Sequence, residues 1–574
     1  MIQLLRSIFA SAAFFLLTVF SFPAIAQNVN HTFSISFVKN VSDTPITGRV
    51  FLAISRNAQP EPRYEAGSYF KSIPFWGKDV DHLQPGKEVV IDTNYLGYPI
   101  TNLRDLPAGD YYIQAIMNVY TQYHRADGHT IWAHQDHWEG QHFNTSPGNF
   151  ISGVHKIHYD PSQSQSFSIQ LDSVLPARHL PPDTKQVKHI KIKSKILSDF
   201  WGHDMYLGAT ILLPKGFDGH PNVHYPVVYE QSHFGLGAPY GFTTQKGPVS
   251  AARKKLFDDY NLEDGYTFQQ QYNSAHFPRM VIVTFQHPTP YYDDSYAVNS
   301  ANNGPYGDAI MKELIPYIEN HYRIIQQPYA RVLTGGSTGG WESMALQLYH
   351  PDFFGGTWTL YPDPLDFRHF QLMDLTKDTN AFCANTFTMP FNANSTWQQS
   401  PRYMMRDNEG QPIRTTKEAS WLEAVLGTHG RSGEQMDIFD AVFGPVGDDG
   451  YPVPLWDNLT GKIDSNAVNY AREHGFDLRY YLAKNWATLG PKLKDKLHVY
   501  VGDADNFYLN LAVYQFQDFL KYTEKPHYEG TFEYGRPMKG HGWQPMPISK
   551  MLEMMAKHIT EHAPKGADTK AWKY

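Results

Sequence analysis

The 574-residue sequence predicts an α/β unit, in which helices flank a mainly parallel sheet, preceded by an N-terminal β-sandwich. Three observations support this prediction. From about residue 190, β-rich runs alternate with helical patterns, which is typical of a parallel sheet covered on both faces. Residues 28 to about 175 instead show period-two alternation broken by Gly, Pro and Asp, as in a sandwich. A long polar stretch over about 367–480 then interrupts the β/α alternation.

The overall composition limits the possible classes. Hydrophobic residues make up 41% of the chain and charged residues 18%, which is typical of a globular protein rather than a disordered one. The net charge is −8 and there is no basic stripe, so we expect no nucleic-acid partner.

The first 26 residues have the pattern of a signal peptide. Arg6 supplies a positive charge, residues 8–20 form a short apolar core, and Ala24-Ile25-Ala26 fits the small-x-small cleavage rule. The mature chain is expected to begin near Gln27, in a secreted or periplasmic protein; an uncleaved anchor is the alternative. Because no second apolar run of spanning length follows, we expect no stable membrane insertion.

The N-terminal β-sandwich is predicted over residues 27–175. Apolar and polar residues alternate along its two ends, at residues 33–37 and 167–171. Residues 176–189 contain three prolines and several charges, and are predicted to be a linker. The segment 124–142 carries five histidines, but no metal-ligand spacing repeats in it. A polar loop is therefore favoured there over a metal site.

The α/β unit is predicted over residues 190–565, with the stretch at about 367–480 inserted over the carboxyl edge of its sheet. A helix is expected from Asp308, which can cap it, to Tyr322. The predicted strands are Ala209–Leu213, Pro226–Glu230, Met280–Phe285, Ala330–Thr334, Thr357–Leu360 and Leu497–Val501. The one cysteine, Cys383, allows no intramolecular disulfide, and no motif around it suggests a nucleophile.

The most specific motif is Gly335-Gly336-Ser337-Thr338-Gly339, which matches the G-x-S-x-G nucleophile elbow. Small residues flank the serine because the chain must turn sharply from a strand into a helix. The apolar run 331–333 before the motif reads as a buried strand, and residues 342–349 after it read as a helix. This context predicts Ser337 as a catalytic nucleophile.

A serine nucleophile needs a base, and the base needs a group that orients it. In folds with such an elbow the acid and then the histidine follow the serine along the chain. His541 lies between two glycines in a loop after the last predicted strand, and it is the predicted base. His558 and His562 fall on an amphipathic helix and are expected to be solvated. Asp505, in the loop after the strand that ends at Val501, is the favoured acid. Two alternatives for the acid remain, namely Asp503 and Asp363.

Such chemistry also requires donors for the oxyanion. The backbone N–H of Thr338, the residue after the nucleophile, is the expected first donor. The second is expected from the loop after the strand 226–230, where the N–H of His233 or Phe234 is the candidate.

These motifs resemble the "putative esterase" branch of the α/β-hydrolases, which includes enterochelin-esterase-like, esterase-D-like and feruloyl-esterase-like enzymes. The resemblance rests on residues 329–340, 502–505 and 540–542, and covers about residues 190–565. It implies an α/β-hydrolase fold and hydrolysis of a carboxylic ester through an acyl-serine intermediate, with no metal or organic cofactor. The loop Ser232-His233-Phe234-Gly235 departs from the His-Gly-Gly pattern frequent in that branch, and the insertion is unusually long.

The sequence therefore predicts an exported serine hydrolase acting on a small-molecule or carbohydrate-linked ester. A serine peptidase or amidase on the same fold is one alternative, and an inactive hydrolase-like binding protein is another. The insertion is rich in charged residues with interspersed aromatics, which favours a soluble ester over aggregated lipid. The alternative is that these charges only form its solvated outer face. They include Arg402, Arg406, Asp407, Glu409, Arg414, Lys417, Glu418, Arg431 and Glu434.

Overall fold

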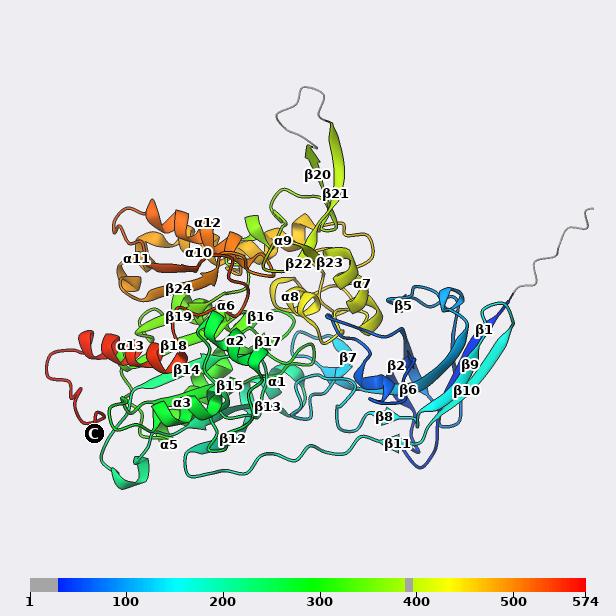
Figure 1. The fold of residues 1–574 in the computed structure, drawn as a ribbon, viewed down its shortest axis with the longest axis horizontal. Coiled ribbons are helices and arrows are strands. Elements are labelled where there is room, and N and C mark those ends of the chain that lie inside the picture. Colours follow the sequence, from blue (N-terminus) through cyan, green and yellow to red (C-terminus); the bar gives the residue numbers. More distant parts are fainter. Residues whose placement is uncertain (1–28, 388–395) are drawn as a thin grey trace, which may run out of the picture.

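The computed structural model describes residues 29–387 and 396–574 (Figure 1). The signal peptide predicted at residues 1–26 lies outside the described residues, as do residues 388–395 of the predicted insertion. In the described part of the chain, no helix has the length and apolar character needed to cross a membrane.

An eight-stranded sheet forms the centre of the larger part of the molecule. Its order is β12-β13-β15-β14-β18-β19-β24-β25, with β12, β13 and β15 paired antiparallel and the remaining pairs parallel. All six predicted strands belong to this sheet, so the α/β class is confirmed. The strands are β12 (Val187–Ser194), β13 (Met205–Leu212), β14 (Val227–Gln231), β15 (Val281–Gln286), β18 (Arg331–Gly336), β19 (Gly356–Leu360), β24 (Leu497–Gly502) and β25 (Thr531–Gly535).

Helices cover both faces of this sheet because its strands are apolar on both sides (Figure 1). They are α1 (Lys195–Trp201), α2 (Ala251–Tyr260), α3 (Gly265–Tyr272), α4 (Tyr306–Ala309), α5 (Ile315–His321), α6 (Thr338–Tyr349), α12 (Leu509–Lys521) and α13 (Ile548–Glu561). The helix predicted from Asp308 begins earlier, at Tyr306, and a π-helical turn at Ile310–Leu314 joins α4 to α5. Asp308 therefore lies inside the first turn and does not cap the helix.

The ends of the α/β unit differ in detail from the predicted ones. Strand β12 begins at Val187, inside the segment 176–189 that was expected to be a linker. Beyond residue 565, Trp572 is fully buried, so the C-terminal tail packs on the same unit. His558 is also buried and contacts Gly355 O through Nε2 at 3.1 Å, so its predicted solvation is wrong. The reason is that its ring packs against Trp358 of β19 and His498 of β24, with ring centroids 5.1 and 5.6 Å apart.

The N-terminal region contains two sheets that share one apolar core. Phe33 and Ile35 of the smaller sheet pack in this core with Val50, Leu52 and Ile54 of the larger sheet. The smaller sheet has the order β10-β1-β4, and the larger has the path β11-β8-β6-β2-β3-β5 with β7 and β9 paired to β6. The strands are β1 (His31–Phe37), β2 (Ile46–Ser55), β3 (Phe75–Leu83), β4 (Val89–Asp92), β5 (Gly97–Tyr98), β6 (Gly109–His124), β7 (Thr130–His134), β8 (Phe150–Ile151), β9 (His155–Tyr159), β10 (Gln165–Leu171) and β11 (Ser173–Val174).

The long excursion of the chain lies between the neighbouring strands β19 and β24. It contains the hairpins β20 (Cys383–Phe387) with β21 (Trp397–Pro401) and β22 (Tyr403–Arg406) with β23 (Pro412–Thr415). Five helices follow, namely α7 (Thr416–Leu426), α8 (Gln435–Phe443), α9 (Ser465–Glu473), α10 (Leu478–Lys484) and α11 (Trp486–Leu493). The hairpin β20–β21 projects from the body of the molecule (Figure 1).

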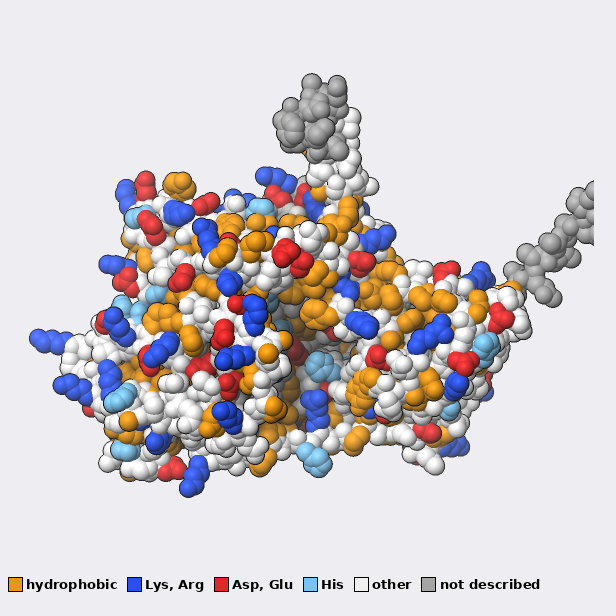
Figure 2. Space-filling model, viewed as in Figure 1, with side chains coloured by type: hydrophobic (Ala, Val, Ile, Leu, Met, Phe, Trp, Pro, Cys, Tyr) orange, Lys and Arg blue, Asp and Glu red, His pale blue; other side chains and the backbone are white. Residues whose placement is uncertain are grey.

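The N-terminal region packs directly against this excursion. Phe75 and Tyr98 form a buried apolar cluster with Leu422, Val425 and Leu426 of α7. Within the same contact, the buried Arg49 guanidinium donates to Val425 O at 3.1 and 2.8 Å. Figure 2 shows that the surface is hollowed where the N-terminal region meets the rest of the molecule.

Candidate active site

Ser337 lies at the sharp turn between β18 and α6, as the elbow motif predicts. Its backbone has φ 59° and ψ −123°, a conformation that costs a non-glycine residue about 1–3 kcal/mol. Helix α6 begins at the next residue, Thr338, so its N-terminus points toward Ser337. Strained backbone of this kind holds the serine hydroxyl above the carboxyl edge of the sheet.

The glycines of the motif are required by close backbone contacts. A Cβ at Gly335 would lie 2.2 Å from Gly339 O, and a Cβ at Gly339 would lie 2.1 Å from Gln231 O. Both distances are far below van der Waals contact. The motif is therefore glycine-rich because the turn packs on itself and on the end of β14.

Asp505 and His541 are brought together although they lie in different loops. His541 Nδ1 is 2.9 Å from Asp505 Oδ2, and the carboxylate is fully buried. The other oxygen, Oδ1, accepts from the backbone N–H groups of Phe507 and Leu509 at 2.9 and 3.2 Å. The His541 backbone N–H is itself held by Asn506 Oδ1 at 2.8 Å. The carboxylate and the imidazole are thus fixed in a defined relative orientation.

The two alternative acids have other partners. Asp503 Oδ1 accepts from the Lys539 backbone N–H at 3.3 Å. Asp363 accepts from Tyr296 OH at 2.6 Å and from Thr338 Oγ1 at 3.0 Å, and its own N–H donates to Ser337 O at 3.1 Å. Burial raises the pKa of Asp363 above its ordinary value. Asp363 therefore braces the turn after Ser337 rather than orienting His541.

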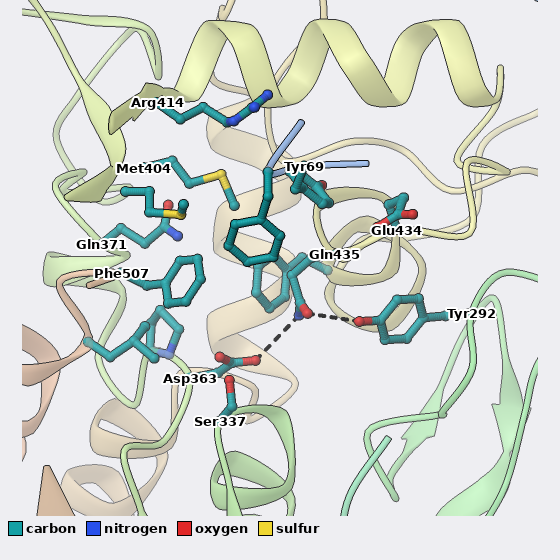
Figure 3. A pocket seen from close by; sticks show the side chains of 15 residues that line it. Tyr69, Tyr292, Ser337, Asp363, Gln371, Met404, Arg414, Glu434, Gln435 and Phe507 are labelled. Carbon is teal, nitrogen blue, oxygen red and sulfur yellow. Dashed lines mark hydrogen bonds between the residues drawn. The ribbon is translucent and has the colours of Figure 1, made fainter. Parts of the chain in front are cut away.

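A cavity of about 180 Å³ opens at Ser337 (Figure 3). Its polar end is formed by Ser337, Asp363 and Gln435, whose amide bridges Asp363 and Tyr292. The rest is mainly apolar and includes Phe70, Met404, Met405, Phe439, Phe507 and Leu509. The ring of Phe507 also lies edge-on to the His541 ring, with centroids 4.9 Å apart, which places His541 beside the cavity.

Comparison with known proteins agrees with this geometry. Residues 203–426 match the family model described as "Putative esterase". The match covers less than half of the chain, and it supports an esterase-type enzyme. The matched region includes the elbow and the first half of the excursion between β19 and β24.

The chain is also similar to several solved structures. A ferulic acid esterase is 16% identical with a TM-score of 0.31, over 66% of this chain and 98% of that chain. An S-formylglutathione hydrolase from Agrobacterium tumefaciens is 11% identical with a TM-score of 0.30, over 67% of this chain and 98% of that chain. An IroE-like serine hydrolase from Shewanella oneidensis is 12% identical with a TM-score of 0.30, over 66% of this chain and 79% of that chain. The comparison with curated proteins found no match. The assignment of this hydrolase rests on the family model.

The predicted oxyanion donors lie on two segments that touch. A Cβ at Gly339 would be 3.1 Å from the backbone nitrogen of Ser232, so the loop after β14 packs against the first turn of α6. Thr338 is on that turn, and His233 and Phe234 are on that loop. The Phe234 ring turns toward the N-terminal region, where its centroid is 5.3 Å from that of Trp138.

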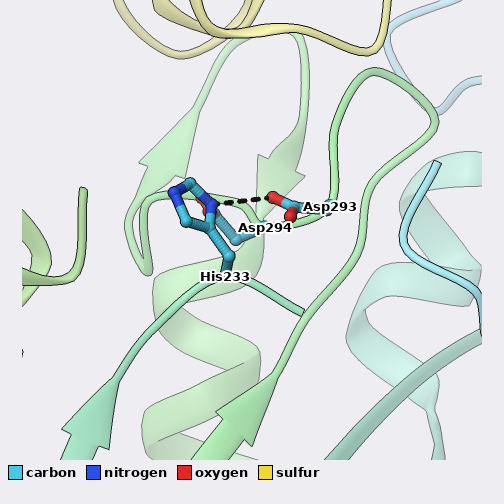
Figure 4. A group of neighbouring side chains, drawn as sticks. All are labelled: His233, Asp293 and Asp294. Carbon is cyan, nitrogen blue, oxygen red and sulfur yellow. Dashed lines mark hydrogen bonds and ion pairs between the residues drawn. The ribbon is translucent and has the colours of Figure 1, made fainter. Parts of the chain in front are cut away.

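The side chain of His233 forms a charged group of its own (Figure 4). Its Nδ1 is 3.1 Å from both Asp293 Oδ1 and Asp294 Oδ2. Burial alone would lower the pKa of His233, but the two carboxylates outweigh it and raise the pKa well above its usual value. Among residues 29–387 and 396–574, these three side chains are the one group of His, Cys, Asp and Glu placed closely enough to hold a metal ion.

The histidine-rich segment 124–142 forms β7 and a loop that packs on the hydrolase. His134 Nε2 is 2.9 Å from Glu139 Oε1, and both side chains are buried. Gln141 Nε2 donates to Thr289 O of the α/β unit at 2.7 Å. The His134–Glu139 pair therefore lies within the segment, and Gln141 connects the segment to the α/β unit.

The insertion lines the cavity with fewer charges than its sequence suggests. Only Arg414 and Glu434 of its nine charged candidates do so. Arg402 is turned toward the backbone of Cys383, and Arg431 donates to Asp79 Oδ2 of the N-terminal region at 3.1 Å. Most of these charged side chains form contacts within the protein. They therefore match neither the expectation that they face the substrate nor the alternative that they form the solvated outer face of the insertion.

Sequence reasoning missed three contributors to the site. Tyr69 and Phe70 of the N-terminal region line the cavity at Ser337. Arg406 of the insertion donates through Nε to Asp505 O at 3.0 Å, and so holds the loop of the predicted acid. No local pattern in the sequence marks these residues.

Proposed function

We propose that this protein is an exported carboxylic-ester hydrolase that acts through an acyl-serine intermediate with Ser337, His541 and Asp505 as its triad. The observation that carries the proposal is the 2.9 Å pair of Asp505 with His541 beside a cavity that opens at the strained Ser337. A buried carboxylate that holds one ring nitrogen leaves the other free to act as base.

In the proposed mechanism, Ser337 Oγ attacks the ester carbonyl while His541 Nε2 takes its proton. His541 then gives this proton to the leaving alcohol, and the acyl-serine forms. A water molecule, activated by the same imidazole, hydrolyses the acyl-enzyme and restores Ser337. The hydrogen bond to Asp505 stabilises the imidazolium in both steps. The hydrogen bond between Ser337 and His541, which is not formed among the described residues, is expected to form when substrate binds.

The developing oxyanion is proposed to accept one hydrogen bond from the backbone N–H of Thr338 and another from the backbone N–H of His233 or Phe234. Each such donor typically contributes about 3–4 kcal/mol to lowering the barrier. The hydrogen bonds of Asp363 to Thr338 and Ser337 support this role, because they fix the backbone that carries the first donor.

We propose a soluble, small-molecule or carbohydrate-linked ester as the substrate. The cavity combines an aromatic and methionine wall with Arg414, Glu434 and the Asp363–Gln435 pair, and this mixture suits an acyl group that is apolar with polar substituents. At about 180 Å³ the cavity is small for a long alkyl chain. The signal-like segment at residues 1–26 supports export, and the two-sheet N-terminal region is proposed to be a β-sandwich domain.

The proposal is tested by labelling with a fluorophosphonate and by turnover of matched esters and amides. We expect wild-type enzyme to be labelled at Ser337 and to hydrolyse short-acyl esters far faster than the matched amides. Faster amide turnover would instead establish the peptidase or amidase alternative. Lack of both labelling and turnover would establish an inactive binding protein.

A further inference from the structure

The loop that carries His541 is held by hydrogen bonds on both sides of the histidine. Before it, the Gly540 N–H donates to Tyr260 OH at 3.1 Å. After it, the Gln544 N–H donates to the backbone O of Tyr260 at 3.3 Å, and Gln544 O accepts from Asn261 Nδ2 at 2.8 Å. Tyr260, the last residue of α2, therefore contacts this loop both before and after the histidine.

The hydroxyl of Tyr260 is in turn held by the insertion. Asn408, in the turn between β22 and β23, donates from Nδ2 to Tyr260 OH at 2.6 Å. Its Oδ1 accepts from Asn506 Nδ2 at 3.0 Å, and Asn506 Oδ1 accepts from the His541 N–H at 2.8 Å. The side chains of Tyr260, Asn408 and Asn506, here called the polar clamp, thus form one chain of hydrogen bonds. The chain joins α2 and the insertion to the loop of the predicted base.

The three side chains of the polar clamp converge on Gly540. A Cβ at this position would lie 2.2 Å from Asn408 Oδ1, 2.4 Å from Asn506 Oδ1 and 2.8 Å from Tyr260 OH. These distances are shorter than any van der Waals contact, so only a glycine lets the three oxygens approach the backbone this closely. The polar clamp therefore surrounds the backbone of the residue immediately before His541.

The polar clamp lies outside the apolar core. No residue of α2 is buried, and Asn408 and Asn506 are half-buried. Neutral hydrogen bonds at such partly exposed places contribute only modestly to the stability of a fold. A catalytic side chain, by contrast, must be held within a fraction of an ångström of its productive position. The position of the loop is therefore the property that these bonds are expected to control.

We propose that Tyr260 and Asn408 are positioning residues that hold the His541 imidazole where it can act as base. This inference rests on the proposed function, in which His541 is that base. The carboxylate of Asp505 fixes the orientation of the ring through Nδ1, whereas the polar clamp fixes the backbone from which the ring extends. The insertion thereby supports the chemical step as well as forming part of the cavity wall.

The test is steady-state kinetics of full-length variants on 4-nitrophenyl acetate. Tyr260→Phe removes only the hydroxyl, which accepts from the Gly540 N–H. We expect kcat to fall about 10-fold and KM to stay within about 2-fold of wild type, because a displaced base slows proton transfer without weakening ester binding. Asn408→Ala should lower kcat to a similar extent. The double variant should be less than about 2-fold worse than either single variant, because both side chains belong to one chain of hydrogen bonds.

Tyr528→Phe is the matched control. Its hydroxyl also accepts from a backbone N–H, that of Leu497, at 3.1 Å. Leu497 is the first residue of β24, at the opposite end of this strand from the loop that carries Asp505. The control therefore removes the same kind of hydrogen bond far from the site, and should keep the kcat of wild type. The melting temperature of each variant reports whether it folds.

A second comparison shows whether the polar clamp acts through His541. In a His541→Ala background, Tyr260→Phe is expected to change the residual turnover less than about 2-fold, because the group that it positions is absent. A further loss of about 10-fold in this background would overturn the proposal. So would a folded Tyr260→Phe with the kcat of wild type, a change in KM alone, or an equal loss of kcat in the control.

Failure of the proposed function has a different signature. If His541 is not the base, His541→Ala alone keeps a turnover close to that of wild type, whatever Tyr260→Phe does. If His541 is the base but the polar clamp does not position it, His541→Ala is nearly inactive while folded Tyr260→Phe and Asn408→Ala both keep the kcat of wild type.

Discussion

The two sides of the cavity at Ser337 are built in different ways. The floor comes from consecutive β/α units of one sheet, whose carboxyl ends carry Ser337 after β18 and Asp505 after β24. The roof comes from segments far apart in sequence, with Tyr69 and Phe70 from the N-terminal region and Met404 and Gln435 from the insertion. The floor carries groups that suit the chemistry, whereas the roof sets the shape and polarity available to a substrate.

The roof is nevertheless connected to the floor. Arg406 of the insertion donates to Asp505 O, and Asn506 Nδ2 donates back to Arg406 O at 2.8 Å. The N-terminal region in turn holds the insertion through the cluster around Val425 and through Tyr98, which accepts a hydrogen bond from Arg414. Changes in the floor should therefore abolish turnover, and changes in the roof should alter selectivity.

The largest effect is expected from the floor itself. Ser337→Ala or His541→Ala should each lower kcat by roughly 10³-fold or more, because nucleophile and base act as one unit. The double variant should be no worse than either single one. Turnover of a short-acyl aryl ester measures this, with circular dichroism as a check of folding. A folded Ser337→Ala protein with near wild-type turnover would rule out Ser337 as the nucleophile.

A somewhat smaller loss is expected from the orienting acid. Asp505→Asn should cost about 10²–10⁴-fold in kcat, because the amide favours the wrong tautomer of His541. Asp503→Asn is the matched control two residues away, and it should stay within a few-fold of wild type since Asp503 contacts the Lys539 backbone instead. If the control is the more damaging change, the acid has been assigned to the wrong residue.

The floor could be predicted from sequence because its signals are local. The elbow is five consecutive residues, and β18 and α6 on either side of it have strong patterns. Chain order then led to His541 and Asp505, although nothing in the sequence measured the 2.9 Å between them. The helix that starts at Tyr306 was misplaced because Asp308 is a good capping residue that lies one turn too late.

The roof could not be predicted, since it depends on contacts between residues hundreds of positions apart. The exposed Phe70 becomes a wall of the cavity only because α7 packs on β3 and β5. The charges of the insertion were also misjudged. Arg431, for example, is a partner of Asp79, and a single sequence does not show which of its many acids that partner is.

The roof also contains a group whose titration should affect stability. Burial, with a smaller contribution from the Asp293 carboxylate, raises the pKa of Glu434 from about 4.5 to about 8. Between these values the unfolded chain releases a proton that the folded chain keeps, so folding stability falls as the pH rises from about 4.5 to about 8. Glu434→Gln has no carboxyl group at this position and avoids this loss. The free energy of unfolding of the variant should therefore rise relative to that of wild type between about pH 5 and about pH 8.5.

The expected size of this gain is of the order of 1–3 kcal/mol, since each unit of pKa difference corresponds to about 1.4 kcal/mol and partial exposure reduces it. Urea unfolding at the two pH values measures it. Glu409→Gln, at an exposed glutamate of the same insertion, is the control and should show no such pH dependence. A constant difference between Glu434→Gln and wild type at all pH values would contradict the expectation.

A change in selectivity is expected from Phe70→Ala. The loss of one aromatic wall should lower kcat/KM about 3–10-fold for esters with a bulky aromatic acyl group, and less than 2-fold for acetate esters. Tyr64→Ala, at a 49% exposed aromatic of the same region that does not line the cavity, is the matched control. Equal losses for both acyl groups would mean that Phe70 acts on the catalytic groups rather than on the acyl group.

The smallest effect is expected from removal of metal ions. His233, Asp293 and Asp294 lie close enough together to hold a cation. However, an imidazole must be neutral to ligate a metal, and the two carboxylates hold the pKa of His233 well above its usual value. At neutral pH the protonated ring therefore donates to the carboxylates and competes with any metal. Dialysis against EDTA should leave ester turnover within about 20% of wild type, as expected when the proposed triad supplies the nucleophile without a Lewis acid. A loss restored by zinc or calcium, and absent in His233→Ala, would show that this group binds a metal the reaction needs.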